Sequence, residues 1–429
     1  MKTAYIVSLG CDKNRVDTEH MLYVLHKGGY GVAQTADKSD VIIVNTCAFI
    51  ESARAEAIDT ILGLAREKHA GQKLVVTGCL PQKYRDELIE GLPEVDAFFG
   101  VREYDKLCGT LDTMFNAQCT TRNDGQECFG RIRTTPEHYA YLRIADGCDN
   151  KCTFCTVPSI RGPYRSRSSD SLVAEAAKLA EQGVRELIII AQDVTRYEDL
   201  CDLLDRLSQI GDIDYIRLMY CYPDAVDNRL IETIRDNPKI VKYIDMPMQH
   251  VSNKILRAMG RKGSGDDLRK LVDKLYAGIP GMAIRTTFMV GFPGETETEF
   301  NELKEFLISH KFRHAGFFAY SCEEDTPSHK LPGHVDEETK AARLAEIAAL
   351  QATIVEEQNR RLIGTAVSAI YEDIDYERNS FIARPLFSAP EVDSLIYFTA
   401  PFADVGKTVK IEITGVDGYD LVGEITNKD

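Results

Sequence analysis

Short apolar runs alternate with amphipathic, helix-like stretches along most of this chain of 429 residues, and this alternation restricts its fold more than any other feature. In the first region the apolar runs are YIVSLG, DVIIVNT and KLVVTG. Strands that alternate with helices at this spacing form parallel sheets with helices on both faces. We therefore predict a doubly wound α/β domain over residues 1–115, followed by a polar linker over residues 116–135.

The alternation continues through residues 136–362. Six apolar runs lie at residues 141–147, 186–193, 215–223, 243–249, 284–294 and 315–321. Helical patterns near 170–182, 225–236, 265–277 and 295–309 separate several of these runs, and a long one at 337–362 closes the region. This pattern predicts an open, partial (β/α) barrel, in which functional residues gather at the carboxyl ends of the strands.

The last region, residues 363–429, has no helical pattern. Its β-like stretches TAVSAIYE, SLIYFTA, TVKIEIT and DLVGEIT are separated by Gly, Pro and Asp. Short strands with such turn signals predict a small antiparallel β-barrel of about the size of an OB-fold.

Composition and charge restrict where the protein acts and what it binds. No apolar run is long enough to cross a membrane, and only ten residues precede Cys11, too few for a lipoprotein signal. Twelve cysteines in a long chain without an export signal indicate metal binding or catalysis in the cytoplasm. The net charge of −16 argues against direct nucleic-acid binding and favours a basic partner.

Three cysteines form a CxxxCxxC triplet, GCDNKCTFC, after the first run of the predicted barrel: Cys148, Cys152 and Cys155. Thiolates are the usual ligands of iron–sulfur clusters. Three of them can hold three irons of a [4Fe–4S] cluster and leave the fourth iron open to S-adenosylmethionine. One electron from the cluster then gives a 5′-deoxyadenosyl radical. One alternative is that these are structural cysteines that are close by coincidence. The other is a zinc site, which would favour CxxC pairs and four protein ligands. The triplet therefore predicts radical S-adenosylmethionine chemistry.

A second set, Cys11, Cys47 and Cys79, follows the three apolar runs of the first region. Any one of them can be read as a buried, inert thiol. Because the carboxyl ends of parallel strands meet at one sheet edge, the three together predict a second three-cysteine [4Fe–4S] cluster. We predict that the other cysteines are structural thiols: Cys108, Cys119, Cys128, Cys201, Cys221 and Cys322.

Polar residues at the ends of the barrel's apolar runs are candidates for contacts with S-adenosylmethionine: Gln192, Asp193, Gln249 and His250. Gly291, in the stretch GFPGE, can bring backbone close to the ligand. Alternatively, this stretch is a strand-to-helix turn with Glu295 in the first helical turn. No catalytic residue is predicted beyond the cluster ligands.

Three arginines follow the triplet: Arg161, Arg165 and Arg167. They can neutralise a carboxylate of the substrate or of the ligand, and we assign Arg161 to the cofactor site on this ground. Equally, they can be ordinary surface or interdomain charges.

Taken in order along the chain, SLGCDKN, NTC, TGC, GCDNKCTFC and RGPYRSR resemble the motifs of the methylthiotransferase family of radical S-adenosylmethionine enzymes. The resemblance covers essentially the whole chain and implies an N-terminal cluster domain, a barrel and a C-terminal TRAM domain. It implies that Cys11, Cys47 and Cys79 ligate an auxiliary [4Fe–4S] cluster, and that the triplet ligates the radical-generating one. One S-adenosylmethionine would donate the methyl group and a second would supply the radical.

Within the family, SLGCDKNRVDTE, IAQDVTRY, LMYCYP and DMPMQH look like the RimO branch, which modifies an aspartate of small-subunit ribosomal protein twelve. Asp12 and the stretch CEED at 322–325 depart from the branch's pattern, and neither is a proposed ligand. The resemblance implies this ribosomal protein as substrate, free or within the ribosomal subunit, and an electron donor. The sulfur donor is left open.

The charge of the last region bears on the substrate. From Gly364 to Asp429 there are twelve Asp or Glu and five Lys or Arg, a net charge of −7. An acidic barrel repels RNA and attracts a basic ribosomal protein. Alternatively, the acidity only aids solubility. Two alternatives remain: a tRNA adenosine methylthiotransferase with the same clusters, and a non-catalytic iron–sulfur protein that binds ribosomes.

Overall fold

The computed structural model describes residues 1–115, 130–401 and 404–426, and these residues group into two compact units. The first unit consists of Met1–Pro136, Asp146–Asn150 and Cys155–Arg165; the second consists of Glu137–Ala145, Lys151–Phe154 and Ser166–Asp429. Most of the predicted linker, with Cys119 and Cys128, lies outside the described residues. The short strands β7 (Ala145–Asp146) and β8 (Arg165–Ser166) stand where the chain passes from one unit to the other.

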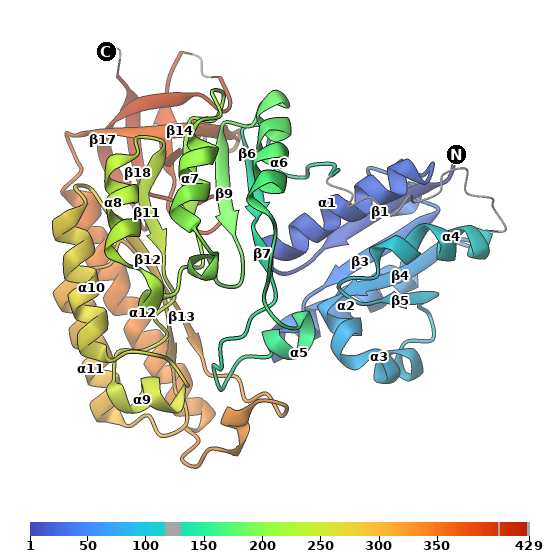
Figure 1. Cartoon of the computed structure of the whole chain (residues 1–429), viewed down its shortest axis with the longest axis horizontal. Helices are drawn as coiled ribbons and strands as arrows, with labels where there is room; N and C mark the ends of the chain where they lie inside the picture. The colour runs from blue at the N-terminus through green and yellow to red at the C-terminus, as the bar shows by residue number, and fades with distance from the viewer. Residues whose placement is uncertain (116–129, 402–403, 427–429) are drawn as a thin grey trace. The chain divides into compact units, whose positions relative to one another are not determined.

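The first unit is built on five parallel strands in the order β2-β1-β3-β4-β5 (Figure 1). The strands are β1 (Thr3–Ser8), β2 (Gly31–Val32), β3 (Val41–Thr46), β4 (Lys73–Gly78) and β5 (Ala97–Phe99). The helices are α1 (Asp12–Lys27), α2 (Glu51–Glu67), α3 (Cys79–Gly91), α4 (Leu107–Phe115) and the short α5 (Val157–Arg161). The apolar runs predicted β1, β3 and β4, whereas β2 and β5 are too short to be recognised from a pattern of apolar residues.

The central strand β3 is buried along its whole length, which explains its continuous apolar sequence. Val41 and Ile43 pack with residues of α1 and α4, whereas Ile42 and Val44 pack with residues of α2 and α3. Helices therefore cover both faces of the sheet, and the predicted doubly wound fold is confirmed.

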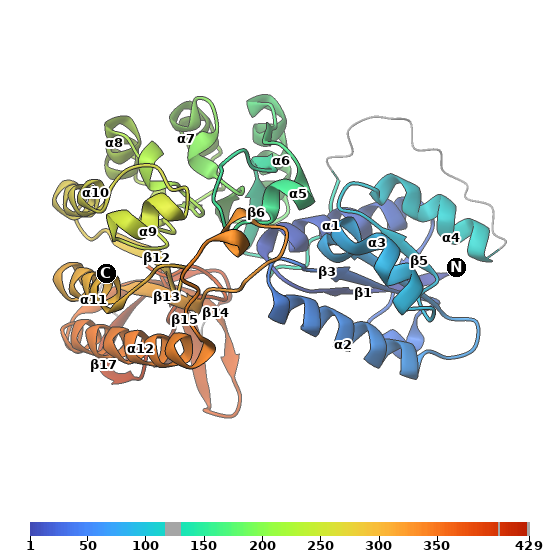
Figure 2. The same ribbon diagram turned by 90° about the horizontal axis from the view of Figure 1, so that it is seen from below.

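The second unit contains six parallel strands in the order β13-β12-β11-β10-β9-β6. They are β6 (Tyr139–Arg143), β9 (Glu186–Ile190), β10 (Tyr215–Leu218), β11 (Ile240–Asp245), β12 (Ala283–Val290) and β13 (His314–Ala319). The helices are α6 (Ser169–Glu181), α7 (Leu200–Ser208), α8 (Asn228–Asp236), α9 (Asn253–Ala258), α10 (Gly265–Gly278), α11 (Glu297–His310) and α12 (Glu337–Arg360). Most of these helices form an arc outside the strands (Figure 2). The sheet does not close, so this is the predicted partial barrel.

The C-terminal strands form a closed five-stranded barrel in the order β14-β15-β16-β18-β17. They are β14 (Ala366–Asp375), β15 (Ser380–Pro385), β16 (Ile396–Thr399), β17 (Thr408–Asp417) and β18 (Asp420–Ile425). The predicted small barrel is confirmed, with two corrections. The strand β15 was missed because buried Arg384 interrupts its apolar pattern and Pro385 ends it. The pair β16–β18 is parallel, because β17 separates the two strands in sequence and pairs antiparallel with β18.

A buried ion network joins this small barrel to the amino ends of the parallel strands. Glu186, the first residue of β9, accepts hydrogen bonds from Arg217 of β10 at 2.7 Å and from Arg384 of β15 at 2.5 Å, and all three side chains are fully buried. Burial raises the pKa of Glu186, but the two guanidinium groups outweigh burial and lower it to about 2. The small barrel thus packs at the amino ends of the parallel strands, and its described residues do not cover their carboxyl ends, where the functional residues were predicted.

Candidate functional site

The first set of cysteines lies at the carboxyl edge of the sheet in the first unit. Cys11 caps the start of α1 after β1, Cys47 follows β3, and Cys79 begins α3 after β4. Burial raises the pKa of the Cys47 thiol, and the neighbouring Cys11 raises it further. Burial likewise raises the pKa of Cys79 to about 12, with Cys11 and Cys47 adding to the increase. Each thiol therefore lies within electrostatic range of the others, as three ligands around one group would.

Two glycines let neighbouring segments approach each other closely at this edge. Gly10 has φ +88°, and a Cβ added there would lie 3.3 Å from the sulfur of Cys47. Gly78 has φ +98°, and a Cβ there would meet the backbone of Thr46 at 2.7 Å. Both positions thus require glycine.

The thiols do not surround a single ion. Among the described residues, no three Cys, His, Asp or Glu side chains are arranged to hold one metal ion. In a [4Fe–4S] cluster each thiolate binds a different iron, so the ligands stand further apart than around one ion. All three cysteines are free of disulfide bonds and lie at the same edge of the sheet, as the ligands of one cluster would.

Arg161 lies beside this set of cysteines. Its buried guanidinium donates to Asp17 at 2.9 Å, to Asn14 at 2.7 Å and to Asp146 at 3.1 Å. The sulfur of Cys79 lies 4.0 Å from the same guanidinium, which lowers the thiol's pKa against the effect of burial. Arg161 therefore supplies fixed positive charge next to a proposed thiolate ligand.

The triplet cysteines lie on the segment that follows β6 and β7. Cys148 donates its backbone N–H to the carbonyl of Gly162 at 3.1 Å, and the sulfur of Cys155 accepts the backbone N–H of Val157 at 3.4 Å. Gly147 has φ +77°, and a Cβ there would lie 2.2 Å from the carbonyl oxygen of Pro163. The chain thus closes tightly around Cys148 because residue 147 has no side chain.

Cys152 belongs to the second unit, where two residues that the sequence analysis missed surround its sulfur. The hydroxyl of Tyr222 lies 2.6 Å from the sulfur, and Nη1 of Arg261 lies 3.8 Å from it. The guanidinium of Arg261 stacks over the Tyr222 ring at 3.9 Å and donates to the carbonyl of Pro247 at 2.6 Å. Tyr222 stands just past the end of β10, a position that the strand-end rule could have selected.

The predicted S-adenosylmethionine contacts do stand at the carboxyl edge of the barrel. Gln192 and Asp193 follow β9, and Gln249 and His250 follow β11. Gln249 adopts φ +71°, an uncommon conformation for a residue with a side chain, and Tyr220, which follows β10, adopts φ +59°. Such strain gathers at sites where a ligand is held.

The side-chain amide of Gln249 has an unsatisfied oxygen atom. Its backbone is fixed on both sides: its N–H donates to Thr287 and its carbonyl accepts from Met289, each at 2.8 Å. Its Oε1 is buried and has no hydrogen-bond partner among the described residues. A buried, unsatisfied amide oxygen is costly unless a ligand donates to it.

The stretch from Gly291 to Glu295 forms a turn held by one carboxylate. Glu295 accepts the backbone N–H of Gly291 at 3.0 Å and a guanidinium N–H of Arg343 at 2.8 Å, and its other oxygen lies 3.4 Å from Nε2 of His250. Gly291 has φ +72°. The following helix α11 begins only at Glu297, because Thr296 and Glu299 form its capping box. The alternative that placed Glu295 in the first helical turn is therefore not what the structure shows.

The other two arginines occupy ordinary positions. Arg167 forms an ion pair with Glu175 at 2.6 Å and donates to the carbonyl of Arg143. Arg165 is exposed in β8. Arg167 thus fixes the start of α6.

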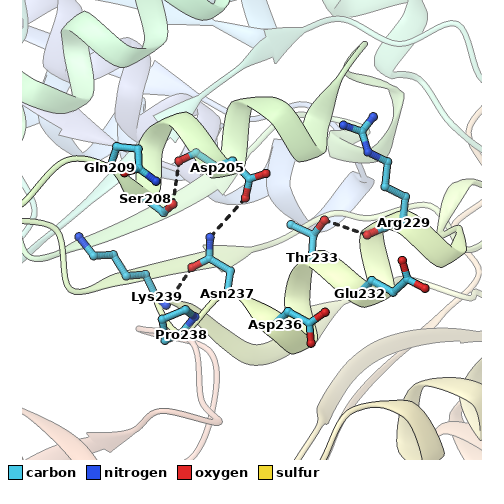
Figure 3. A pocket seen from close by; sticks show the side chains of 10 residues that line it. All are labelled: Asp205, Ser208, Gln209, Arg229, Glu232, Thr233, Asp236, Asn237, Pro238 and Lys239. Carbon is cyan, nitrogen blue, oxygen red and sulfur yellow. Dashed lines mark hydrogen bonds between the residues drawn. The ribbon is translucent and has the colours of Figure 1, made fainter.

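A polar pocket of about 520 Å³ between α7 and α8 is a separate feature (Figure 3). It is lined by Asp205, Ser208, Gln209, Arg229, Glu232, Thr233, Asp236, Asn237, Pro238 and Lys239. The pocket lies at the amino end of β11, and its polar groups largely bond to one another, as Asn237 does with Asp205 and Lys239. It is therefore distinct from the candidate site at the carboxyl edge.

Comparison with known families divides the chain into three. Residues 3–100 match Uncharacterized protein family UPF0004, residues 142–307 match the Radical SAM superfamily, and residues 363–426 match the TRAM domain.

Full-length relatives decide the family. The chain is 42% identical to the ribosomal protein uS12 methylthiotransferase RimO of Pelobacter propionicus, with 99% of this chain and 98% of the relative covered. The chain is 39% identical to the RimO of Acetivibrio thermocellus, with 100% of this chain and 99% of the relative covered. It is 42% identical to the RimO of Clostridioides difficile, with 97% of each chain covered. The chain belongs to the RimO family.

Solved structures with low sequence identity share the fold of this RimO-family protein. The radical S-adenosylmethionine methyltransferase TsrM of Kitasatospora setae, with cobalamin and a [4Fe–4S] cluster bound, aligns with TM-score 0.58 and 14% identity over 76% of this chain and 74% of TsrM. The radical enzyme OxsB, with aqua-cobalamin and S-adenosylmethionine bound, aligns with TM-score 0.52 and 12% identity over 82% of this chain and 58% of OxsB. Within the described part of the RimO-family chain, no helix has the length and apolarity to span a membrane.

Proposed function

We propose that this protein adds a methylthio group to the β-carbon of an aspartate of ribosomal protein uS12. The observation that carries the proposal is the similarity to uS12 methylthiotransferases over essentially the whole chain. One three-cysteine set stands at the ends of β1, β3 and β4, and the other lies in the segment between β7 and α5. The chain is a radical S-adenosylmethionine methylthiotransferase by family, and the target residue is the step that we add.

The six cysteines fit two clusters. Cys148, Cys152 and Cys155 would hold one [4Fe–4S] cluster, and Cys11, Cys47 and Cys79 a second. When bound, the first cluster supplies the electron that splits S-adenosylmethionine, and the second presents the sulfur to be transferred. The β C–H bond of aspartate is not acidic enough for a side-chain base, and abstraction of a hydrogen atom avoids this difficulty.

The protein's own residues bind and orient the reactants. The buried Oε1 of Gln249 would accept a hydrogen bond from S-adenosylmethionine, and the peptide backbone at Gly291 would pass beside the ligand. Gln192 and Asp193, from the neighbouring β9, would add polar contacts at the same edge. Glu295 would keep the Gly291 turn and His250 in place. Arg161 would offset the negative charge of thiolate ligands near Cys79.

Charge supports a protein rather than tRNA as substrate. The net charge of −7 over residues 364–429 attracts a basic ribosomal protein, and the whole chain carries −16. We place the reaction in the cytoplasm, with uS12 free or in the ribosomal subunit, and it requires an electron donor. The sulfur donor is not assigned.

The test is expression in a host that lacks its own methylthiotransferases, followed by mass spectrometry of uS12 and of tRNA. A mass gain of one methylthio group on the uS12 peptide is the expected result. A methylthio gain on tRNA adenosine, with none on uS12, would refute the proposed substrate. Iron for two clusters without any 5′-deoxyadenosine from the reduced enzyme would instead indicate a non-catalytic iron–sulfur protein.

A further inference from the structure

A second pocket, of about 460 Å³, lies in the second unit at the amino ends of β12 and β13. Its walls come from the end of α10, the segments that precede β12 and β13, the end of α12 and the turn after β15. The lining residues are Tyr276, Gly281, Met282, Ala283, Lys311, Arg313, Gln358, Arg361, Leu362 and Phe387. It therefore lies at the sheet edge opposite to the proposed S-adenosylmethionine contacts, and the proposed reaction does not use it.

The charge of this pocket is opposite to that of the protein. The chain carries a net charge of −16, yet three of the lining residues are Lys or Arg and none is Asp or Glu. A concave site lined by charges of one sign concentrates ligands of the other sign. The pocket is therefore suited to an anion.

Arg313 is the cation in this pocket that lacks a carboxylate. It is partly buried, its guanidinium stacks over the Phe387 ring at 4.4 Å, and Nη1 donates to Oδ1 of Asn359 at 3.1 Å. It forms no ion pair within the described ranges 1–115, 130–401 and 404–426. Burial lowers the pKa of its guanidinium, with Tyr276 as the one opposing interaction. A partly buried cation without a counter-charge is stabilised when an anion binds.

Lys311 and Arg361 already converge on one oxygen atom. Nζ of Lys311 lies 2.6 Å from Oε2 of Glu357, and Nη2 of Arg361 lies 3.7 Å from the same atom. Glu357 is 53% exposed and does not line the pocket. An entering anion can therefore replace the carboxylate without burying it.

We propose that this pocket binds a phosphate group of a nucleotide, with Arg313, Lys311 and Arg361 as its ligands. Three cations suit a phosphate better than a single carboxylate, and guanidinium groups bind phosphate through paired hydrogen bonds. The apolar walls around Met282, Leu362 and Phe387 offer contact area for the nucleoside, and the pocket's volume lies in the range of small-molecule sites. The nucleotide can be free or part of an RNA strand.

The test measures binding of inorganic phosphate, AMP and a short single-stranded RNA to the full-length holoenzyme by calorimetry. Arg313→Gln and Arg361→Gln are expected to weaken binding about tenfold or more, because each removes a charged hydrogen-bond donor. Glu357→Gln is expected to tighten binding, because it removes the competing carboxylate. Arg235→Gln is the control: Arg235 is exposed and pairs with adjacent Asp236.

The results of these measurements distinguish a free nucleotide from an RNA strand as the source of the bound phosphate group. Binding of AMP that Arg313→Gln weakens supports the site with a free nucleotide, and binding of RNA but not AMP that the same variant weakens supports it with RNA. If Arg313→Gln does not fold, Arg361→Gln and Glu357→Gln still decide, since a disrupted fold cannot tighten binding. No binding of any probe at millimolar concentration, or equal binding by wild type and all three pocket variants, would overturn the proposal. Cleavage of S-adenosylmethionine is expected to stay unchanged in Glu357→Gln.

Discussion

The hydroxyl of Tyr222 lies 2.6 Å from the sulfur of Cys152, although 70 residues separate them in sequence. Hydrogen bonds to ligand sulfurs stabilise the reduced cluster and raise its potential. We expect Tyr222→Phe to lower the midpoint potential of the cluster by up to about 60 mV, a tenfold change for one electron. Redox titration followed by EPR measures it.

The control is Tyr215→Phe, which removes a hydroxyl that contacts Thr408 in the small barrel. A potential unchanged in Tyr222→Phe would mean that the hydroxyl turns away from the sulfur when the cluster is bound. The iron content of both variants should equal that of the wild type.

Substitutions in the two cysteine sets should have different effects on cleavage of S-adenosylmethionine. Cys152→Ala is expected to lose about four of about eight irons and all cleavage of S-adenosylmethionine. Cys47→Ala is expected to lose a similar amount of iron but to keep 5′-deoxyadenosine formation, because its cluster does not split S-adenosylmethionine. Cys201→Ala, which removes a buried thiol outside both sets, is the control and should keep full iron content. Full iron in Cys47→Ala would contradict the second cluster.

Sequence patterns located the cysteines because strand ends are local features. Cys11, Cys47 and Cys79 follow apolar runs, and a parallel sheet necessarily brings the ends of its strands to one edge. The structure places all three at that edge.

What the sequence did not reveal depends on tertiary contacts. Arg261 approaches Cys152 from 109 residues away, and no spacing rule links them. Arg161 was assigned by residue type alone, whereas its ion pair with Asp17, 144 residues away, fixes its position beside Cys79. The strained backbone of Gln249 follows from pairing with Thr287 and Met289 and has no sequence signature.

The buried network at Glu186 should be sensitive to loss of its charge. Glu186→Gln leaves Arg217 and Arg384 without the carboxylate that they share, so we expect the free energy of unfolding to fall by about 3–5 kcal/mol. Urea denaturation followed by circular dichroism measures it. Asp202→Asn, which breaks the exposed pair with Arg229, should cost about 1 kcal/mol or less. Equal losses in the two variants would contradict this role.

His314 should make stability depend on pH. Burial lowers its pKa to about 4, although Asp393 opposes this, and its Nε2 donates to the carbonyl of Phe387 at 2.8 Å. Between the unfolded pKa of about 6.5 and the folded value, the unfolded chain binds a proton that the native protein does not. Stability therefore falls as pH drops through this window, by up to about 3 kcal/mol. Wild type should lose more unfolding free energy than His314→Gln between pH 7 and pH 5, as denaturant titrations at each pH can measure.

Gln249 allows binding and backbone strain to be separated with two variants. Gln249→Ala and Gln249→Gly both remove the buried amide oxygen, so both should weaken S-adenosylmethionine binding about tenfold. Only glycine adopts φ +71° freely, so Gln249→Gly should be more stable than Gln249→Ala by about 1 kcal/mol. Calorimetry on the reconstituted enzyme and thermal unfolding measure the two effects. Wild-type affinity in Gln249→Gly would mean that the backbone conformation, and not the amide, serves the ligand.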